Sequence, residues 1–314
     1  MKRNFFNMCL FVVIILLQIS CSVDFEPNIN VQPIAVLNVL VENDSTVSAS
    51  VTRTWRFADN KQIIVQDDAD VYLSVNGEDM GQMQFNAEFG KYCSSYIAKQ
   101  GDIISIKADT HNYGSAVGKT VVPKIVPIES FTCSAARVTD YDGFEISPDG
   151  SIKNVEALDV YYKITFTDPG DEDNYYMIGS SINGENEPLL KEHDEALDEI
   201  FLLNEEFNVF TDKSINGRTY TLTLSSRIYH WNLRYMVDTI KLYSISYDYY
   251  LYMLSIYRKY CGINGQLESV GIANPKDIYT NVSPGVGIVA ASSFDMVQYD
   301  KTDDVKRLFP EWIQ

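Results

Sequence analysis

The sequence predicts a mostly β protein, in which an N-terminal immunoglobulin-like β-sandwich precedes a larger β-rich domain with one main helix. Three observations lead to this fold class. Apolar residues fall in short or alternating runs, turn residues separate these runs, and only one segment has helical periodicity. The length of 314 residues exceeds the usual size of a single domain. We therefore predict two domains, over residues 31–123 and 124–314.

The first residues resemble an export signal. Lys2 and Arg3 precede an uninterrupted apolar run of ten residues from Met8 to Leu17. This run is too short to cross a hydrocarbon core, which needs about 20 residues, but it suits the apolar region of a cleaved signal. We assign residues 1–20 to a signal peptide.

A cysteine follows this signal directly. Ser20-Cys21 resembles the end of the lipobox of bacterial lipoproteins, in which the cysteine is acylated and becomes the first residue after cleavage. Several acyl chains, such as palmitate, give a stable membrane anchor. Residues 21–30 would then be a lipid-anchored tether, and Asp24 and Glu26 resemble the acidic stretch that directs some lipoproteins to the cell surface. The alternative is an ordinary cleaved signal followed by a chance cysteine.

The first domain contains seven candidate strands. Asn76-Gly77 is a hairpin signal, because both positions of a two-residue turn require a positive φ. Seven short strands with turn signals about every 8 to 12 residues are typical of an immunoglobulin-like sandwich. The strands are Ile34–Val41, Thr46–Thr54, Asp70–Val75, Met80–Phe85, Tyr92–Ala98, Ile103–Asp109 and Ser115–Val122.

The second domain begins after Pro123–Pro127, where two prolines lack the backbone donor that regular strand pairing needs. Asp140–Gly150 is predicted as a polar loop, and Leu158–Thr167 and Tyr175–Ser181 as the two strands of a hairpin. Leu189–Asn204 is acidic and ambiguous, with a short amphipathic helix as one interpretation. The remaining candidate strands are Ile128–Val138, Arg218–Ile228, Thr239–Ile245 and one within Gly285–Tyr299.

The main helix is predicted over about residues 246–260. Ser246 can cap its start, and Gly262 lies just past its end. The residues that share one helical face are Tyr247, Tyr250, Leu251, Leu254 and Tyr257.

Tyrosine is concentrated in this helix and the strand before it, with seven of the 21 tyrosines between residues 243 and 260. Consecutive helical residues differ in direction by about 100°, so one face cannot bury them all. Tyr249 and Tyr252 lie off the apolar stripe and are candidate contacts for a sugar ring or another protein. The alternative is packing against the neighbouring strand and domain.

A second candidate site is the acidic loop between residues 168 and 174. Hard cations such as calcium take about six to eight oxygen ligands, which makes Asp168, Asp171 and Asp173 candidate ligands. Their spacing differs from that of the EF-hand calcium loop. The favoured interpretation is a solvated hairpin tip, and we expect no metal and no cofactor.

Four groups of short segments occur in a fixed order in the second half. They are Phe166-Thr167-Asp168-Pro169-Gly170 with Asn174-Tyr175-Tyr176, Phe210-Thr211-Asp212 with Asn216-Gly217, Leu242–Ser246 with Tyr249-Tyr250 and Leu254, and Ile278–Val282 with Gly285–Ile288. Behind a lipoprotein signal and a β-rich first domain, this order resembles the domain of unknown function 4249 family of Bacteroidota. Members look like outer-membrane lipoproteins and are often encoded near TonB-dependent receptors of the SusC type.

Several function classes are disfavoured by composition. A net charge of −18 repels phosphate backbones, so we expect no nucleic-acid partner. The three histidines lie in unrelated contexts, and no Gly-x-Ser-x-Gly, His-Glu-x-x-His or phosphate-binding loop occurs. The resemblance assigns no catalytic residue either, and we expect no enzyme. Cys93, Cys133 and Cys261 are an odd set whose spacing does not decide whether any two form a disulfide.

These observations lead to one expected function and one alternative. The resemblance implies a lipid-anchored, non-catalytic outer-membrane protein that is an accessory or binding component of a TonB-dependent (SusC-like) uptake system. Its partners would be the membrane, through the lipid on Cys21, and a TonB-dependent receptor. The alternative is an independent surface lipoprotein that binds glycans or peptides.

Overall fold

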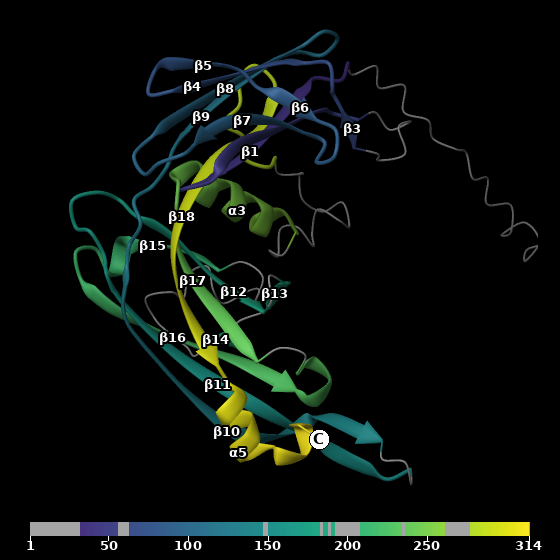
Figure 1. Ribbon diagram of the computed structural model, residues 1–314, viewed down its shortest axis with the longest axis vertical. Coiled ribbons are helices and arrows are strands. Elements are labelled where there is room, and N and C mark those ends of the chain that lie inside the picture. The colour runs from purple at the N-terminus through teal and green to yellow at the C-terminus, as the bar shows by residue number, and fades with distance from the viewer. Residues whose placement is uncertain are drawn as a thin grey trace, which may run out of the picture. The chain divides into compact units, whose positions relative to one another are not determined.

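The computed structural model describes residues 32–55, 63–146, 150–182, 185–187, 190–191, 208–233, 236–260 and 277–313. The signal peptide, the tether with Cys21, and Cys261 lie outside these residues, as does all but a short strand of Leu189–Asn204. The described residues are mostly β, which confirms the predicted fold class (Figure 1).

The N-terminal strands form two sheets that enclose one hydrophobic core. The order β6-β7-β2-β1 in one sheet and β5-β4-β8-β9 in the other is that of an immunoglobulin-like Greek key. The strands are β1 (Ala35–Glu42), β2 (Thr46–Arg53), β3 (Ile64–Val65), β4 (Asp70–Val75), β5 (Glu78–Gln82), β6 (Gln84–Asn86), β7 (Lys91–Ile97), β8 (Ile103–Thr110) and β9 (Gly114–Val121).

The predicted turn is present but its return strand is divided. Asn76 and Gly77 have φ of 54° and 85°, as a two-residue hairpin turn requires. The prediction of one strand over Met80–Phe85 was wrong, because β5 pairs with β4 whereas β6 pairs with β7 in the other sheet. The buried Met83 lies between them, and its N–H donates to the carbonyl of Val71 at 2.8 Å. The chain therefore changes sheets inside what looks like a single run.

The C-terminal strands enclose a second core between the sheet β10-β11-β16-β14 and the strands β12, β17 and β18. The strands are β10 (Ile128–Ile146), β11 (Ile152–Thr167), β12 (Tyr175–Ile182), β13 (Glu185–Glu187), β14 (Leu190–Lys191), β15 (Val209–Thr211), β16 (Thr219–Tyr229), β17 (Val237–Ile245) and β18 (Val286–Asp300). The helices are α3 (Tyr247–Tyr260) and α5 (Thr302–Leu308), with 3-10 segments at Asp212–Ser214, His230–Asn232 and Pro310–Ile313.

Two predictions in this part were wrong. The Asp140–Gly150 loop is mostly strand, because the pairing of β10 with β11 resumes at Phe144 after a bulge that breaks the alternation. The β11–β12 hairpin does not form, since β11 pairs with β10 and β16, and β12 pairs with β13, β15 and β17. The two strands instead face each other across the core, where the rings of Phe166 and Tyr176 are 5.4 Å apart.

Strand β18 belongs to both halves of the chain (Figure 1). Residues 286–292 pair in parallel with β1, and residues 292–300 pair antiparallel with β17. Two glycines leave room for β18. A Cβ on Gly118 of β9, in the facing sheet, would lie 2.4 Å from Val289 Cγ2, and a Cβ on Gly287 of β18 would lie 2.0 Å from the carbonyl oxygen of Leu37 in β1. Pro33–Gln314 is one compact unit by its contacts, so the division at residue 123 stays a prediction.

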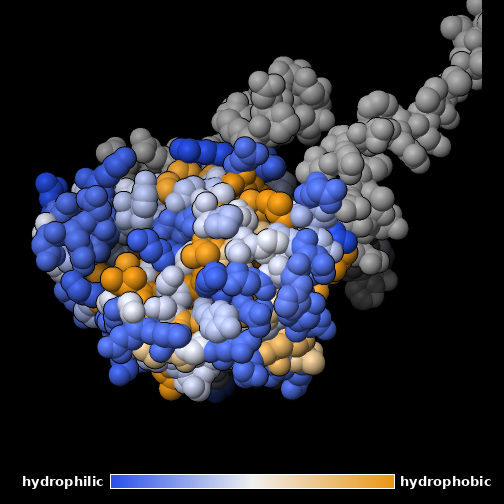
Figure 2. Space-filling model, turned by 90° about the horizontal axis from the view of Figure 1, so that it is seen from above, coloured by the Kyte–Doolittle hydropathy of each residue, from blue (hydrophilic) through white to orange (hydrophobic). Residues whose placement is uncertain are grey.

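The surface of the N-terminal sandwich is mixed. Figure 2 shows that hydrophobic residues on this face form small patches separated by hydrophilic ones.

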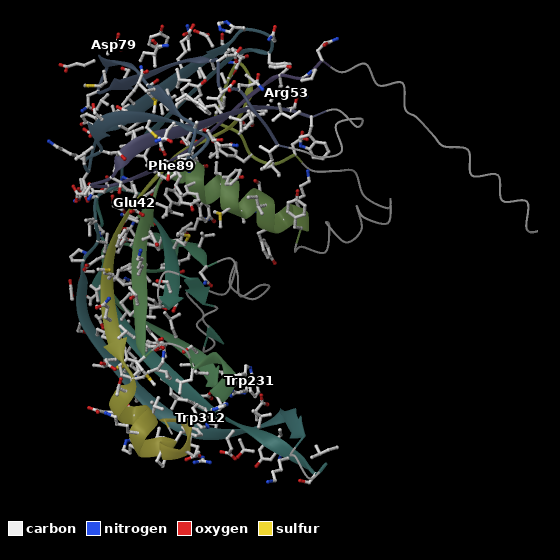
Figure 3. All side chains as sticks on the ribbon, turned by 45° about the vertical axis from the view of Figure 1, so that its right-hand side comes forward. Glu42, Arg53, Asp79, Phe89, Trp231 and Trp312 are labelled. Carbon is white, nitrogen blue, oxygen red and sulfur yellow. The ribbon has the colours of Figure 1, made fainter. Side chains whose placement is uncertain are left out.

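Two tryptophans of the C-terminal part, Trp231 and Trp312, lie on 3-10 segments (Figure 3). The centroids of the His230 and Trp312 rings are 6.0 Å apart.

Candidate functional site

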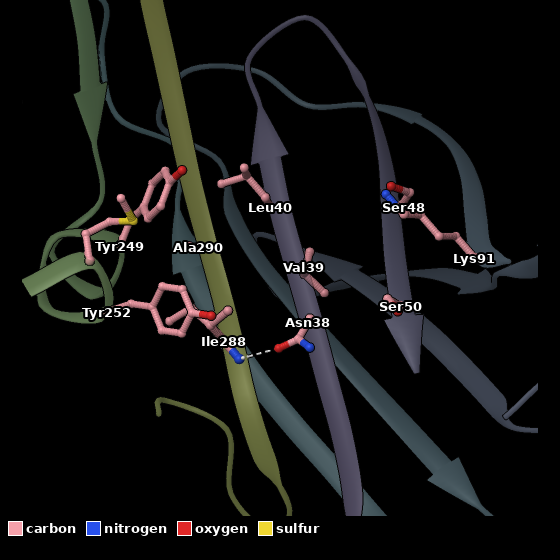
Figure 4. Close-up of a pocket in the computed structure, with 11 residues that line it drawn as sticks. Asn38, Val39, Leu40, Ser48, Ser50, Lys91, Tyr249, Tyr252, Ile288 and Ala290 are labelled. Atoms are coloured by element: carbon pink, nitrogen blue, oxygen red, sulfur yellow. Dashed lines mark hydrogen bonds between the residues drawn. The ribbon is translucent and has the colours of Figure 1, made fainter. Parts of the chain in front are cut away.

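A groove of about 300 Å³ lies between helix α3 and the outer face of the sheet that contains β18, β1, β2 and β7 (Figure 4). We call it the α3 groove. Both candidate tyrosines line it, together with residues from the first and last strands of the chain. The lining residues are Asn38, Val39, Leu40, Ser48, Ser50, Lys91, Tyr249, Tyr252, Met253, Ile288 and Ala290.

The helical wall is fixed by Ser246, as the sequence predicts. Its Oγ accepts the N–H of Tyr249 at 3.3 Å, which caps α3, and the N–H of Ala291 at 3.2 Å, which ties the cap to β18. Tyr249, Tyr252 and Met253 then lie at i, i+3 and i+4 spacing on the groove side. Tyr250 points elsewhere, and its buried ring lies 5.1 Å from Tyr175.

The floor follows from the alternation of the strands. Leu37 and Val39 of β1 are in the first hydrophobic core, so Asn38 and Leu40 face outward. Leu40 is 54% exposed, which shows that α3 leaves part of this face open.

Several polar groups of the groove remain available. Asn38 Oδ1 accepts the N–H of Ile288 at 3.3 Å, which positions the amide at the floor. The hydroxyls of Ser48, Ser50 and Tyr252 and the amine of Lys91 make no hydrogen bond to any other described residue. A bound molecule can therefore reach these donors and acceptors without breaking an internal bond.

The groove holds a single charge among its lining residues, the ammonium of Lys91. Tyr249 is partly buried, and burial, followed by the proximity of Tyr252 and Glu42, raises its pKa above the ordinary value. Its phenol therefore stays protonated at neutral pH and can donate a hydrogen bond. Glu42 does not line the groove, but it lies close enough to Tyr249 to affect the pKa of that phenol.

The candidate ligands of the acidic loop differ in their surroundings. Asp168 is 1% exposed, and its oxygens accept the Tyr176 hydroxyl at 2.5 Å and the Gly217 N–H at 2.9 Å. Asp171 and Asp173 are exposed. No group of three potential metal ligands occurs in the part of the chain that the structure describes. Asp168 therefore has a structural role inside the fold and lies apart from the exposed Asp171 and Asp173, and the cation-loop hypothesis stays a prediction.

Two of the three cysteines considered above, Cys93 and Cys133, lie in the described residues. Cys93 and Cys133 are free thiols, so these two do not form a disulfide. Burial raises the pKa of the Cys133 thiol, with Asp304 and Asp238 adding to the effect, and this disfavours the reactive thiolate.

Sequence reasoning identified the two tyrosines but missed the opposite side of the groove. Ser48 and Ser50 are ordinary residues of the predicted strand Thr46–Thr54, and Lys91 is an exposed residue just before the predicted strand Tyr92–Ala98. Only the pairing of β18 with β1 and the placement of α3 bring them to the same groove, and no local pattern reports such long-range pairing.

Comparison with known proteins gives a family but no function. No curated protein matches the chain. Among solved structures, a protein described as membrane anchored from Corynebacterium diphtheriae is 13% identical, with a TM-score of 0.20 over 69% of this chain and 55% of that one. A glycosyl hydrolase family 2 member from Bacteroides cellulosilyticus DSM 14838 is also 13% identical, with a TM-score of 0.19 over 68% of this chain and 27% of that one.

The chain thus spans about half and about a quarter of these two proteins, and TM-scores this low support no conclusion about its function. In the described part of the chain, every helix is too short or too polar to cross a membrane. The family described as "Domain of unknown function (DUF4249)" matches residues 22–297, so this chain belongs to that family, as the ordered segments of its second half predict.

Proposed function

We propose that this protein is a non-catalytic lipoprotein of the outer membrane, anchored through Cys21, and that it is an accessory or binding component of a TonB-dependent (SusC-like) uptake system. The α3 groove is its binding site in this proposal. The observation that carries it is the groove itself, in which Tyr249 and Tyr252 lie across a partly open sheet surface from polar groups that make no hydrogen bond to other residues of the described ranges.

The chemistry of the groove supports binding rather than turnover. Among the described residues that line it there is no carboxylate and no histidine, and Lys91 is the single ionisable group of that set apart from the tyrosines. General acid–base catalysis needs a positioned proton donor and acceptor with pKa values near the working pH. The raised pKa of Tyr249 moves that group further from this range.

The proposed location of the protein at the outer membrane is supported by the sequence. An apolar run followed by Ser20-Cys21 is the pattern of an acylated cysteine, and the family described above resembles outer-membrane lipoproteins encoded near SusC-type receptors. A lipid anchor would hold the α3 groove close to a receptor, which raises the effective concentration of one for the other.

Co-purification tests this proposal. The full-length protein is isolated from native membranes in mild detergent, and its companions are identified by mass spectrometry. We expect acylated Cys21 at the N-terminus and a TonB-dependent receptor among the companions. The Cys21→Ser variant is the control and should lose both membrane attachment and the receptor. A native protein that is freely soluble and unmodified at Cys21 would contradict the proposal.

The second candidate is an independent surface lipoprotein that binds glycans or peptides. It is favoured by one feature, which is that the lining of the α3 groove combines the aromatic rings of Tyr249 and Tyr252 with the hydroxyls of Ser48 and Ser50. Retention of a ligand by the acylated protein, with no receptor recovered, would support this alternative.

A further inference from the structure

We propose that the α3 groove binds an acidic saccharide. The sugar ring lies against Tyr249 and Tyr252, its hydroxyls bond to the serines of β2 and to Asn38, and its carboxylate pairs with Lys91. This inference rests on the proposed function, because it names the ligand of the same groove.

The tyrosine wall fits a sugar ring. A pyranose has an apolar face of C–H groups and a polar edge of hydroxyls, and tyrosine combines an apolar ring with a polar hydroxyl. Met253 and Ile288 extend the apolar part of the lining beside the tyrosines. Small-ligand sites commonly have this composition, in which apolar and aromatic walls carry a few placed polar groups.

The floor of the groove offers hydroxyl groups to the hydroxyls of a sugar. β1 is paired with β18 from Val36 to Glu42, and with β2 over Ala35–Asn38. Ser48 and Ser50 lie on β2, and their hydroxyls make no hydrogen bond to another described residue. These hydroxyls can therefore both donate to and accept from the hydroxyls of a bound saccharide.

The charges select an acidic ligand and orient it. The chain has a net charge of −18, yet the single charge in the lining is positive. Figure 4 shows the Lys91 side chain extending from β7 across β2 toward Ser48, on the side of the groove away from the tyrosines. Glu42 lies near Tyr249 and disfavours an anion there. A carboxylate at Lys91 and a neutral ring at the tyrosines satisfy both constraints.

The test compares three probes on the full-length protein in mild detergent, by titration calorimetry. The probes are a galacturonate trisaccharide, the uncharged galactose trisaccharide and a hexapeptide with a free C-terminal carboxylate. We expect the galacturonate probe to bind best and its affinity to fall as NaCl is raised. The Lys91→Gln variant should weaken its binding about 10- to 100-fold, the range for one charged hydrogen bond.

Matched variants separate a specific site from general charge and from misfolding. Lys163→Gln removes an exposed lysine of β11 that makes no ion pair with another described residue, and it should leave affinity unchanged. Tyr252→Ala should abolish binding of the galacturonate probe, whereas Tyr252→Phe should retain most of it because the ring remains. Unchanged thermal unfolding of each variant confirms that it is folded.

Three results would each overturn this inference. The first is equal affinity for the acidic and uncharged trisaccharides, and the second is a higher affinity for the peptide. The third is an equal effect of Lys91→Gln and Lys163→Gln on the affinity for the galacturonate probe. The absence of binding to all three probes would overturn it as well. If a TonB-dependent receptor still co-purifies in these cases, the proposed function stands and only the ligand class is wrong.

Discussion

The two larger hydrophobic cores among the described residues, those of the N-terminal and the C-terminal strands, differ in what fills them. The first core holds mainly aliphatic side chains, with Leu37, Leu73 and Ile104 among the largest that are fully buried. In the second core the largest are aromatic, and they include Tyr162 and Tyr176. Both cores lie between β-sheets, so the same architecture is stabilised in two chemically different ways.

In the second core, tyrosine hydroxyls are hydrogen-bonded to charged side chains that are buried with them. Tyr162 donates to Asp238 Oδ2 at 2.8 Å, and Asp238 also pairs with Lys301, whose side chain is 1% exposed. Burial, with Asp238 adding to the effect, raises the pKa of Tyr162 well above its ordinary value, so the hydroxyl stays a donor. The first core therefore depends on packing, whereas the second also depends on every buried charge keeping its partners.

The largest difference between the cores should appear when Lys301 is removed. Lys301→Met leaves the Asp238 carboxylate buried without its counter-charge, and we expect it to lower the free energy of unfolding by about 3–5 kcal/mol. Urea unfolding at pH 7 measures this loss.

A double variant tests whether the unpaired charge is the cause. Lys301→Met with Asp238→Leu removes both charges and should recover most of the stability. Tyr162 would keep its contact with Ser226 Oγ, which lies 3.0 Å from its hydroxyl. Equal losses in the single and double variants would show that packing, and not charge, explains the effect.

The first core should respond to a lost side chain and not to a lost charge. Leu37→Ala creates a cavity at a position that is 0% exposed, and we expect a loss of about 2–5 kcal/mol. Leu40→Ala, at the outward position of the same strand, should change stability by about 0.5 kcal/mol or less. The Leu37→Ala loss should be the same at pH 5 and pH 7, and a loss that depends on pH would contradict the comparison.

Hydroxyl deletions sharpen the comparison further. Tyr176→Phe removes a donor to the buried Asp168 carboxylate, and we expect a loss of about 1.5–3 kcal/mol. Tyr92→Phe in the first core removes a hydroxyl that donates to the Gln66 carbonyl at 2.8 Å and accepts the Ala69 N–H at 2.8 Å. Its partners are neutral, so we expect about 0.5–1.5 kcal/mol. Thermal unfolding of both variants checks the order, and a larger loss for Tyr92→Phe would reverse it.

Local patterns predicted most elements of both cores. Alternation located the strands, and the Ser246 cap with its tyrosine spacing located α3, because these signals lie within a few residues of one another. The bulge after Asp140 and the change of sheets at Met83 were missed, since each alters pairing without altering composition.

In the candidate site too, local patterns predicted some residues, and long-range pairing placed others that were not predicted. Tyr249 and Tyr252 were predicted because helical geometry places them off the predicted apolar stripe, and Tyr249 also packs partly against the hydrophobic cluster around Tyr250. Lys91 was not predicted, because its place in the α3 groove depends on pairing between strands far apart in the sequence. The loop of Asp168 has the composition of a solvated turn, yet its carboxylate is buried by partners that the topology brings from other elements.

The smallest expected effect is a gain in stability and not a loss, and it comes from replacing Asp212 at the edge of the second core. Asp212 is 4% exposed and accepts the Asn174 N–H at 2.9 Å. Burial raises its pKa above the ordinary value, and the nearby Asp168 and Asp173 add to the effect. A carboxyl whose pKa is raised by folding stabilises the fold fully when protonated, and this contribution is lost as the pH rises through the folded-state pKa.

Asp212→Asn should therefore make the protein slightly more stable than the wild type at pH 7, since the amide oxygen can still accept the Asn174 N–H without a charge. The advantage should shrink toward pH 4, near the ordinary pKa of aspartate of about 3.9, because a carboxyl whose pKa is raised in the folded state is more than half protonated at that ordinary value. Urea unfolding of both proteins across this range measures the difference. A variant that is less stable than the wild type at pH 7 would mean that the Asp212 charge supports the second core, as Asp238 does, instead of opposing it.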